Sequence, residues 1–305
     1  MDLCIIGQEK SECNLKLLEE AKKKFDSVFF VSVDGIGIGL SKEFSISYRS
    51  TNILKFGAVL PRIPKQYYSY SYQLLSLFPS NTFMPIKPIS FLLADERFFL
   101  LTVLRKRNIP TTNMYSARST KASYRLLSDA SYPIIVRSLQ KKSGVIVNNE
   151  KEARNIIETF NTLKQPILIE DTIKDMISLY VAAPGIIAAV KKKTKERDVV
   201  FSSGEMKKYS PTIEETHLAI EAAQAVDANI ARVDISTNGE PKVVNIELNF
   251  NITKPTKITG INIAEKIIES VYENYKEYLE RPMLFKFFDD AKSVVKDALK
   301  TKQVL

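Results

Sequence analysis

Cysteine, histidine and tryptophan are scarce in this sequence, and their scarcity excludes several kinds of site. The 305 residues include no tryptophan and two cysteines, Cys4 and Cys13, which match neither a zinc-binding pattern nor a disulfide framework. Such cysteine usage favours a reducing compartment. The one histidine, His217, lies in a predicted helix and is interpreted as a structural or surface residue. We therefore expect neither a serine–histidine triad nor a multi-histidine metal site.

Long hydrophobic runs are also missing. The longest apolar stretch, residues 179–190, is interrupted by Pro184–Gly185 and is too short to cross a bilayer, so it is predicted to be a hairpin. No basic leader precedes an apolar stretch at the start of the sequence, so we expect no secretory signal. These features predict a cytoplasmic protein with no membrane partner.

The residues that are present indicate a globular protein with a basic surface. Hydrophobic residues make up 45% of the chain and charged residues 26%, as is usual for soluble domains. The length allows two or three domains with ordinary cores. The 44 lysines and arginines outnumber 35 acidic residues and give a net charge of +9. This balance favours anionic partners such as a nucleotide, a nucleic acid or an acidic substrate.

The spacing of apolar residues predicts an α/β fold. The stretch G-x-G-x-G at residues 35–39 is followed by a strand-like segment rather than a helix, so we reject it as a dinucleotide-binding fingerprint. A first domain boundary is expected near Ser90. In the part before it, the predicted elements are strands at residues 2–7, 27–33 and 56–63 and a helix at residues 14–25.

The remainder of the chain continues this alternation of strands and helices. A loop containing threonine and asparagine is expected between Pro110 and Tyr132. Asn149 is predicted to cap one helix, and Thr212 with Glu215 predicts a capping box on another. The predicted helices are residues 96–108, 149–163, 212–226, 259–279 and 284–299, and the predicted strands are residues 132–139, 143–149 and 165–171, followed by a hairpin at 177–193.

The most informative segment is residues 231–251, which reads as two strands joined by a turn at Asn238–Gly239. Asp234 ends an apolar run, and Glu247 and Asn249 are two apart on the returning strand, so the latter two side chains point the same way. Two carboxylates and an amide oxygen on adjacent strands favour Mg²⁺ carrying nucleotide phosphates. From these residues alone, a solvated hairpin face is the alternative interpretation.

Several motifs, taken in order, resemble the ATP-grasp superfamily, most closely the RimK-type carboxylate–amine ligases. The resemblance runs from about Phe56 to Tyr275. It is carried by AVLPRI, ERFFLLTVLRKRNIP, YPIIVRSL, ILIEDTI, IIAAVKKK, RVDIS followed by VNIELNFN, and TGINIAEKII. It implies an ATP-grasp fold whose parts are an N-terminal pre-ATP-grasp α/β domain at residues 1–90, a central lid subdomain at 91–165, a C-terminal metal-binding subdomain at 166–280 and a helical extension at 281–305.

The resemblance also implies roles for individual residues. Asp234, Glu247 and Asn249 would hold Mg²⁺, or Mn²⁺ in its place, between the phosphates of ATP. The two family lysines that touch phosphate fall on Arg97 and Arg137, and arginine can bind phosphate bidentately.

Further nucleotide-binding residues follow from the same resemblance. Asp171 and Thr172 fall at the nucleotide hinge, and Asp175 falls on the ribose side. Lys192 occupies a position directed at the γ-phosphate and is the residue to which we assign a catalytic role, while Ser203 stands where the family usually has asparagine. Independently of the family, the basic Arg62 is suited to hold an acidic substrate.

The sequence departs from the family pattern on the catalytic and acceptor side. The glycine-rich lid, whose backbone amides approach phosphate, reads LQKKSG and has one glycine, Gly144. The family arginine two residues after the hinge aspartate is replaced by Ile177, and Ser203 replaces the asparagine. The metal-binding residues are therefore retained, whereas the groups that would align an acyl phosphate with an amine are weakened.

Two functions are compatible with these observations. The first is an enzyme, an ATP-dependent ligase acting on carboxylate and amine substrates through an acyl phosphate, with glutamate ligation to a small molecule or an acidic protein tail as the family expectation. The alternative is a catalytically degenerate ATP-grasp protein that serves as a regulatory factor or binds RNA or the ribosome through basic residues. The helix predicted at residues 284–299 could also join two copies into a homo-oligomer.

Overall fold

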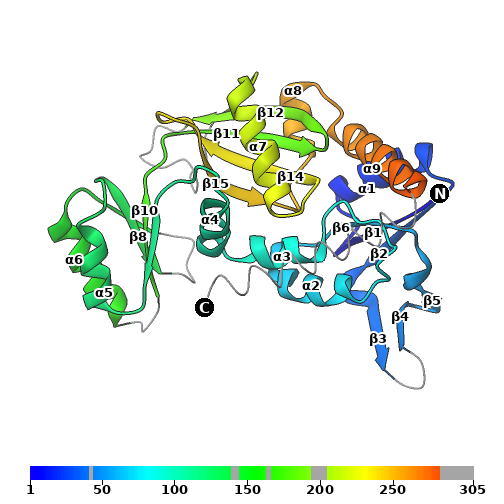
Figure 1. Cartoon of the computed structure of the whole chain (residues 1–305), viewed down its shortest axis with the longest axis horizontal. Coiled ribbons are helices and arrows are strands. Elements are labelled where there is room, and N and C mark those ends of the chain that lie inside the picture. The colour runs from blue at the N-terminus through cyan, green and yellow to red at the C-terminus, as the bar shows by residue number, and fades with distance from the viewer. Residues whose placement is uncertain (41–43, 139–143, 163–165, 194–204, 282–305) are drawn as a thin grey trace. The chain divides into compact units, whose positions relative to one another are not determined.

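The computed structural model describes residues 1–40, 44–138, 144–162, 166–193 and 205–281. It divides into two compact units, one combining Met1–Pro88 with Ala264–Leu305 and the other spanning Ile89–Ile263. Figure 1 colours the chain by residue number and labels most of the helices and strands of both units. Helices and sheets both contribute extensively, so the predicted α/β class is confirmed.

The first unit is built on a parallel sheet with the strand order β2-β1-β6. Residues 3–6 of the central strand are fully buried, as expected for an apolar strand that has a neighbour on each side. Helix α1 packs against β1 and β2 and is capped by the hydroxyl of Ser11. These elements are β1 (Asp2–Gly7), α1 (Glu12–Lys24), β2 (Ser27–Ser32) and β6 (Ala58–Arg62).

A small antiparallel sheet in the same unit contains the G-x-G-x-G stretch. Gly37 and Gly39 lie in β3, which pairs with β4 along its whole length. The next described element after these glycines is thus a strand, as the sequence indicated. The elements here are η1 (Val33–Gly35), β3 (Ile36–Leu40), β4 (Phe44–Tyr48), β5 (Thr51–Asn52), η2 (Ile53–Lys55), η3 (Lys65–Tyr67) and α2 (Tyr68–Ser76).

Helix α9 (Ile263–Glu280) brings a late segment of the chain back to the first unit. Tyr272 meets Phe25 edge to face at a centroid distance of 5.3 Å, and Tyr275 stacks on Phe83 at 5.4 Å. The helix starts later than the predicted residue 259 because Gly260, with φ of 74°, ends the preceding helix in the left-handed conformation. The helix predicted at 284–299 lies outside the described residues.

The second unit contains a four-stranded antiparallel sheet with the order β7-β10-β8-β9. Helices α5 and α6 pack on each other and against this sheet (Figure 1). The predicted cap at Asn149 is confirmed, since its side chain accepts from the amide of Glu152 at the start of α6. The elements are β7 (Met114–Ala117), α5 (Thr120–Leu127), β8 (Ile134–Ser138), β9 (Val145–Val147), α6 (Glu150–Asn161) and β10 (Ile167–Asp171).

The loop predicted between Pro110 and Tyr132 is wrong, because this segment contains β7 and α5. Strand β7 pairs with β10, and α5 is capped by Ser119 and buries Leu127 in the core of the sheet. Both elements are short, and eight residues or fewer offer too little periodicity to distinguish them from a loop in the sequence.

A five-stranded antiparallel sheet, β13-β12-β11-β14-β15, forms the rest of the second unit. Both predicted hairpins are confirmed, and Gly239 in the second turn has a φ of 83°. Helix α7 packs against four of the five strands, and its predicted capping box between Thr212 and Glu215 is present. The strands are β11 (Asp175–Ala182), β12 (Gly185–Lys193), β13 (Glu205–Lys208), β14 (Ile230–Ser236) and β15 (Lys242–Glu247).

The remaining helices of the second unit are α3 (Pro88–Asp95), α4 (Arg97–Lys106), α7 (Ile213–Ala225) and α8 (Thr253–Thr259). Helix α4 packs against β15 and β7, so it contacts both sheets of this unit. No helix in the described ranges combines the length and the hydropathy needed to span a bilayer.

Candidate active site

The three predicted metal-binding residues come from adjacent strands of the five-stranded sheet. Asp234 lies in β14, Glu247 is the last residue of β15, and Asn249 follows two residues later. The register places Arg232 opposite Glu247 and Asp234 opposite Asn245. Because facing residues of an antiparallel pair project from the same side of a sheet, Asp234 and Glu247 share one face.

Asp234 is buried and hydrogen-bonded through both carboxylate oxygens. It is 3% exposed. Ser178 of β11 donates its hydroxyl to Oδ1 at 2.6 Å. Arg232 donates from Nε to Oδ1 at 3.0 Å and from Nη2 to Oδ2 at 2.9 Å. A carboxylate at this depth needs such partners, and they hold its orientation.

Arg232 joins the two predicted metal-binding carboxylates. Its Nη1 lies 2.6 Å from Oε2 of Glu247, whose side chain is 37% exposed. Burial by itself would lower the pKa of Arg232, but the charges of Asp234 and Glu247 outweigh it and raise that pKa. Tyr180 lies opposite Arg232 on β11, and burial is the main cause of its raised pKa. The guanidinium of Arg232 is thus a permanent positive charge that lies between two carboxylates and opposite a tyrosine.

The oxygen donors suit a hard divalent cation. Asp234, Glu247 and Asn249 offer carboxylate and amide oxygens, which are the ligands that Mg²⁺ prefers. Within the residues the structure describes, no group of three or more His, Cys, Asp and Glu side chains could hold a metal. A cation at this position would therefore depend on the amide of Asn249, on water or on nucleotide phosphate as well as on the two carboxylates.

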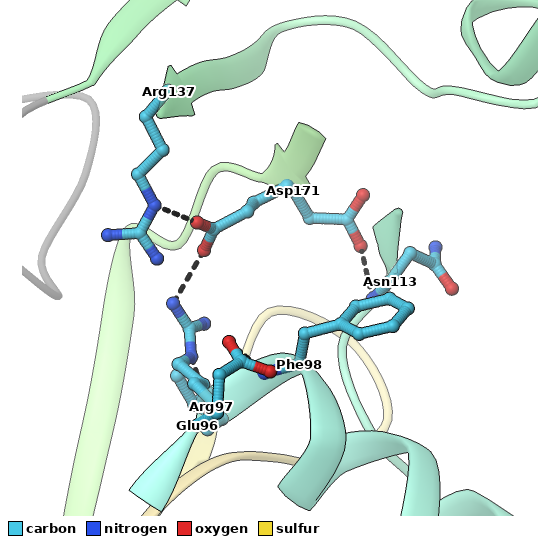
Figure 2. Close-up of polar contacts among 8 residues, drawn as sticks. Glu96, Arg97, Phe98, Asn113, Arg137 and Asp171 are labelled. Atoms are coloured by element: carbon cyan, nitrogen blue, oxygen red, sulfur yellow. Dashed lines mark hydrogen bonds and ion pairs between the residues drawn. The ribbon is translucent and has the colours of Figure 1, made fainter. Parts of the chain in front are cut away.

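A buried cluster of ion pairs forms a second part of the site (Figure 2). Glu170 of β10 is 2% exposed and accepts from Nη1 of Arg97 at 2.5 Å. The same carboxylate forms an ion pair with Nε of Arg137. Figure 2 shows the two arginines pointing toward one carboxylate from separate elements, Arg97 from the start of α4 and Arg137 from β8.

The strand register explains why this cluster forms. Arg137 of β8 faces Leu168 of β10, two residues before Glu170, so the two charged side chains are diagonal neighbours on one face. Arg97 also donates from Nε to the carbonyl of Val244 in β15 at 2.9 Å. The arginine cluster is thereby attached to the strand that ends in Glu247.

The predicted hinge residues Asp171 and Thr172 and the predicted ribose-side residue Asp175 lie where the chain passes from β10 to β11. Asp171 ends β10 and accepts from the amide of Asn113 at 3.0 Å, and Figure 2 shows it directed toward Asn113. The Thr172 hydroxyl donates to the Pro133 carbonyl at 3.2 Å. Asp175 begins β11 and is partly exposed. Their roles toward a nucleotide stay predictions.

The other predicted site residues are distributed over both units. Lys192 of β12 lies opposite Met176 of β11. Met176 is two residues from Ser178, so both point to the same face, and Ser178 lies opposite Asp234. Lys192 therefore projects from the face that carries Asp234. Arg62 ends β6 in the first unit and is 2% exposed. Ser203 lies outside the described residues.

Gly144, the one glycine of the altered lid, has a packing role of its own. A Cβ atom at this position would lie 2.5 Å from Cγ2 of Ile135 and 3.2 Å from Cβ of Arg137. Only glycine allows the chain to approach β8 this closely, directly beside the arginine of the buried cluster.

Two residues that hold these clusters together, Glu170 and Arg232, were not singled out in the sequence. Glu170 follows the apolar residues ILI in the run ILIED, and an acid inside a buried strand is a signal for a paired charge. Arg232 lies two residues before Asp234 in a predicted strand, so alternation places both on one face. Both signals are present in the sequence, but neither identifies the residue with which the charged side chain pairs.

The two sheets and the clusters between them define the ATP-grasp class of fold. A solved structure of the ATP-grasp ligase PsnB, complexed with minimal precursor, matches with a TM-score of 0.71 at 13% identity, covering 88% of this chain and 97% of that one. Another PsnB structure, with minimal precursor, Mg and ADP, matches with a TM-score of 0.68 at 13% identity and covers 90% and 97%. These similarities show the fold.

The chain belongs to the RimK-like ATP-grasp domain family, whose model matches residues 94–271. A probable alpha-L-glutamate ligase from Nitrosococcus oceani is 26% identical over 275 residues, which cover 85% of this chain and 91% of that protein. The predicted family and ATP-grasp fold are confirmed, and the protein is an ATP-grasp enzyme of the carbon–nitrogen ligase type.

Proposed function

We propose that this protein is a carboxylate–amine ligase that adds glutamate, or another amino acid, to an acidic small molecule or an acidic protein tail. The observation that carries the proposal is the presence, in one compact unit, of a buried arginine cluster and a carboxylate pair. Arg97 contacts the backbone of β15, which ends in Glu247, so the two groups are attached to one strand. ATP requires both, because its phosphates bind guanidinium groups and its metal binds acidic oxygens.

In the proposed reaction the γ-phosphoryl group of ATP passes to a substrate carboxylate and ADP leaves. The amine of the second substrate then attacks the carbonyl carbon of the acyl phosphate. A C–N bond forms, the C–O bond to phosphate breaks, and inorganic phosphate leaves. No protein nucleophile is needed, so the protein contributes positioning and electrostatic stabilisation. A mechanism without a protein nucleophile agrees with a chain that has one histidine.

Arg97 and Arg137 are proposed to face the phosphates. Two guanidinium groups share the single carboxylate of Glu170, so the cluster carries one net positive charge. A guanidinium has five N–H donors, and the contacts of Arg97 with Glu170 and Val244 use two of them. Glu170 thus positions both arginines and neutralises one of their two charges, so that one positive charge remains for an anion.

The remaining site residues are proposed to complete the nucleotide site. Bound Mg²⁺ would offset the negative charge that develops on the phosphates during transfer. Asp234, Glu247 and Asn249 would hold the cation, and Lys192, on the same face as Asp234, would approach the γ-phosphate. The residues proposed around the base, ribose and acceptor are Asp171, Thr172, Asp175 and Ser203.

The nature of the substrates is supported by relatives and by charge. The Nitrosococcus relative is named a probable glutamate ligase, and PsnB was solved with a minimal precursor, which supports glutamate and a peptide-like acceptor as the two substrates here. The net charge of +9 favours an acidic acceptor. Family membership and the paired clusters favour this ligase over the alternative module that binds RNA or the ribosome.

An ATP-turnover screen tests the proposal. Purified protein is incubated with ATP, Mg²⁺ and a panel of amino acids and acidic peptides, and ADP, phosphate and the mass of the product are measured. We expect ADP release that requires both a carboxylate and an amine substrate and that Asp234→Ala abolishes. Glu240→Ala, which removes an exposed carboxylate from the turn of the same hairpin, should leave turnover unchanged. ADP release without any acceptor would contradict a ligase.

A further inference from the structure

The guanidinium of Arg232 lies between the two carboxylates that are proposed to hold the metal. Nε and Nη2 bind Asp234 in a bidentate contact at 3.0 and 2.9 Å, and Nη1 contacts Glu247 at 2.6 Å. All three nitrogens of one planar group are therefore directed at the predicted metal ligands. The register accounts for this, since Arg232 is two residues from Asp234 on β14 and directly opposite Glu247 on β15.

These contacts and metal coordination compete for the same carboxylate oxygens. Mg²⁺ binds its ligands at about 2.0–2.1 Å in near-octahedral geometry. Guanidinium N–H groups that point at Oδ2 of Asp234 and Oε2 of Glu247 occupy the space in front of those oxygens. They also supply one of the two positive charges that would balance the pair of carboxylates. A divalent cation that binds both carboxylates therefore competes with the guanidinium group for space and for charge.

We propose that Arg232 is an internal counter-ion that competes with the divalent cation for Asp234 and Glu247, so that the nucleotide-free protein binds metal weakly. The inference rests on the proposed metal role of these two residues. The Glu247 contact is the one that opens first, because the side chain of Glu247 is 37% exposed whereas that of Asp234 is 4% exposed and bound bidentately by Arg232. ATP would then bring the metal in together with phosphates that compensate for the displaced contact.

A metal titration without nucleotide tests this directly. Mn²⁺ serves as the probe, and the free hexaaquo ion is followed by electron paramagnetic resonance. Removal of the competing cation in Arg232→Ala should tighten Mn²⁺ binding by about tenfold or more, the factor to which 1.4 kcal/mol corresponds. Arg232→Lys keeps the charge but loses the bidentate fork, so its Mn²⁺ affinity should lie between that of the native protein and that of Arg232→Ala. Circular dichroism checks that each variant is folded.

The outcomes separate this inference from the proposed ligase. Equal Mn²⁺ affinity in the native protein, Arg232→Ala and Arg232→Lys would overturn the inference and leave the ligase standing. Binding that tightens in Arg232→Ala and disappears in Arg232→Ala/Asp234→Asn would support it even if no ligase substrate is found. No binding to any variant, with or without ATP, would overturn both. If Arg232→Ala does not fold, Arg232→Gln and Arg232→Lys carry the same comparison.

Discussion

Glu170 is a single carboxylate on which two buried arginines depend. Both Arg97 and Arg137 have side chains that are no more than 12% exposed, and each is paired to Glu170. Glu170→Gln would leave two buried positive charges without their counter-ion. We expect the free energy of unfolding to fall by about 3–5 kcal/mol, the usual cost of breaking a buried ion pair. Urea denaturation of the two proteins measures it.

A surface ion pair provides the matched control. Glu277 pairs with Arg281 one helical turn later, and its side chain is 63% exposed. Glu277→Gln makes the same chemical change but should cost no more than about 0.5 kcal/mol, because solvent screens the pair. Similar losses for Glu170→Gln and Glu277→Gln would show that the buried cluster does not have the role assigned to it.

The two cysteines are expected to differ in reactivity because they differ in burial. Cys4 is fully buried in β1, and burial raises the pKa of its thiol to about 12. Cys13 is partly exposed at the start of α1. With a disulfide reagent at pH 8 we expect one thiol to react quickly and the other only after unfolding. Cys13→Ser should remove the fast phase, and a fast phase that persists would contradict the burial of Cys4.

At the scale of elements, helix α7 supports the sheet that carries the carboxylate pair. The Thr212 hydroxyl accepts from the Glu215 amide, and the Glu215 carboxylate accepts from the Thr212 amide at 2.8 Å. Thr212→Ala should destabilise the protein by about 1 kcal/mol, while Thr212→Ser keeps the cap and should be nearly neutral. Thermal unfolding distinguishes the two, and equal losses would argue against the cap.

Elements could be predicted from the sequence where their signals were long or chemically specific. The hairpin around Asn238–Gly239 follows from a turn that needs a positive φ, and α7 follows from its capping box and 13 residues of helical pattern. Strand β7 and helix α5 were mistaken for a loop, because four and eight residues are too few to establish a period. Their stability comes instead from pairing with β10 and from packing in the core beside it.

At the scale of the whole molecule, the first unit is closed by residues more than 200 positions apart. Gly57 lies against Tyr275 of α9, and a Cβ atom at Gly57 would overlap the phenolic oxygen. Tyr275 cannot move aside easily, because its ring stacks on Phe83. Gly57→Ala should therefore cost about 1–3 kcal/mol, as overpacking usually does.

A second substitution tests the cause of that loss. Removing the phenolic oxygen in Tyr275→Phe leaves the nearest ring carbon 3.3 Å from the added Cβ atom, which small adjustments can accommodate. We expect the Gly57→Ala loss to shrink to less than half in the Tyr275→Phe background, measured as a double-mutant cycle by denaturation. An unchanged loss would mean that backbone freedom at Gly57, and not the contact with α9, sets the cost.

The sequence by itself determined the α/β class and the ATP-grasp resemblance. It also determined that the side chains of Glu247 and Asn249 point the same way, because all of these depend on local spacing. It also identified Asp234 as a candidate ligand. Only the tertiary structure decided that Glu170 lies between Arg97 and Arg137 and that Arg232 lies between Asp234 and Glu247. The partner of a buried charge is set by which strands and helices become neighbours, and the pairing of separate elements leaves no periodic signal in the sequence.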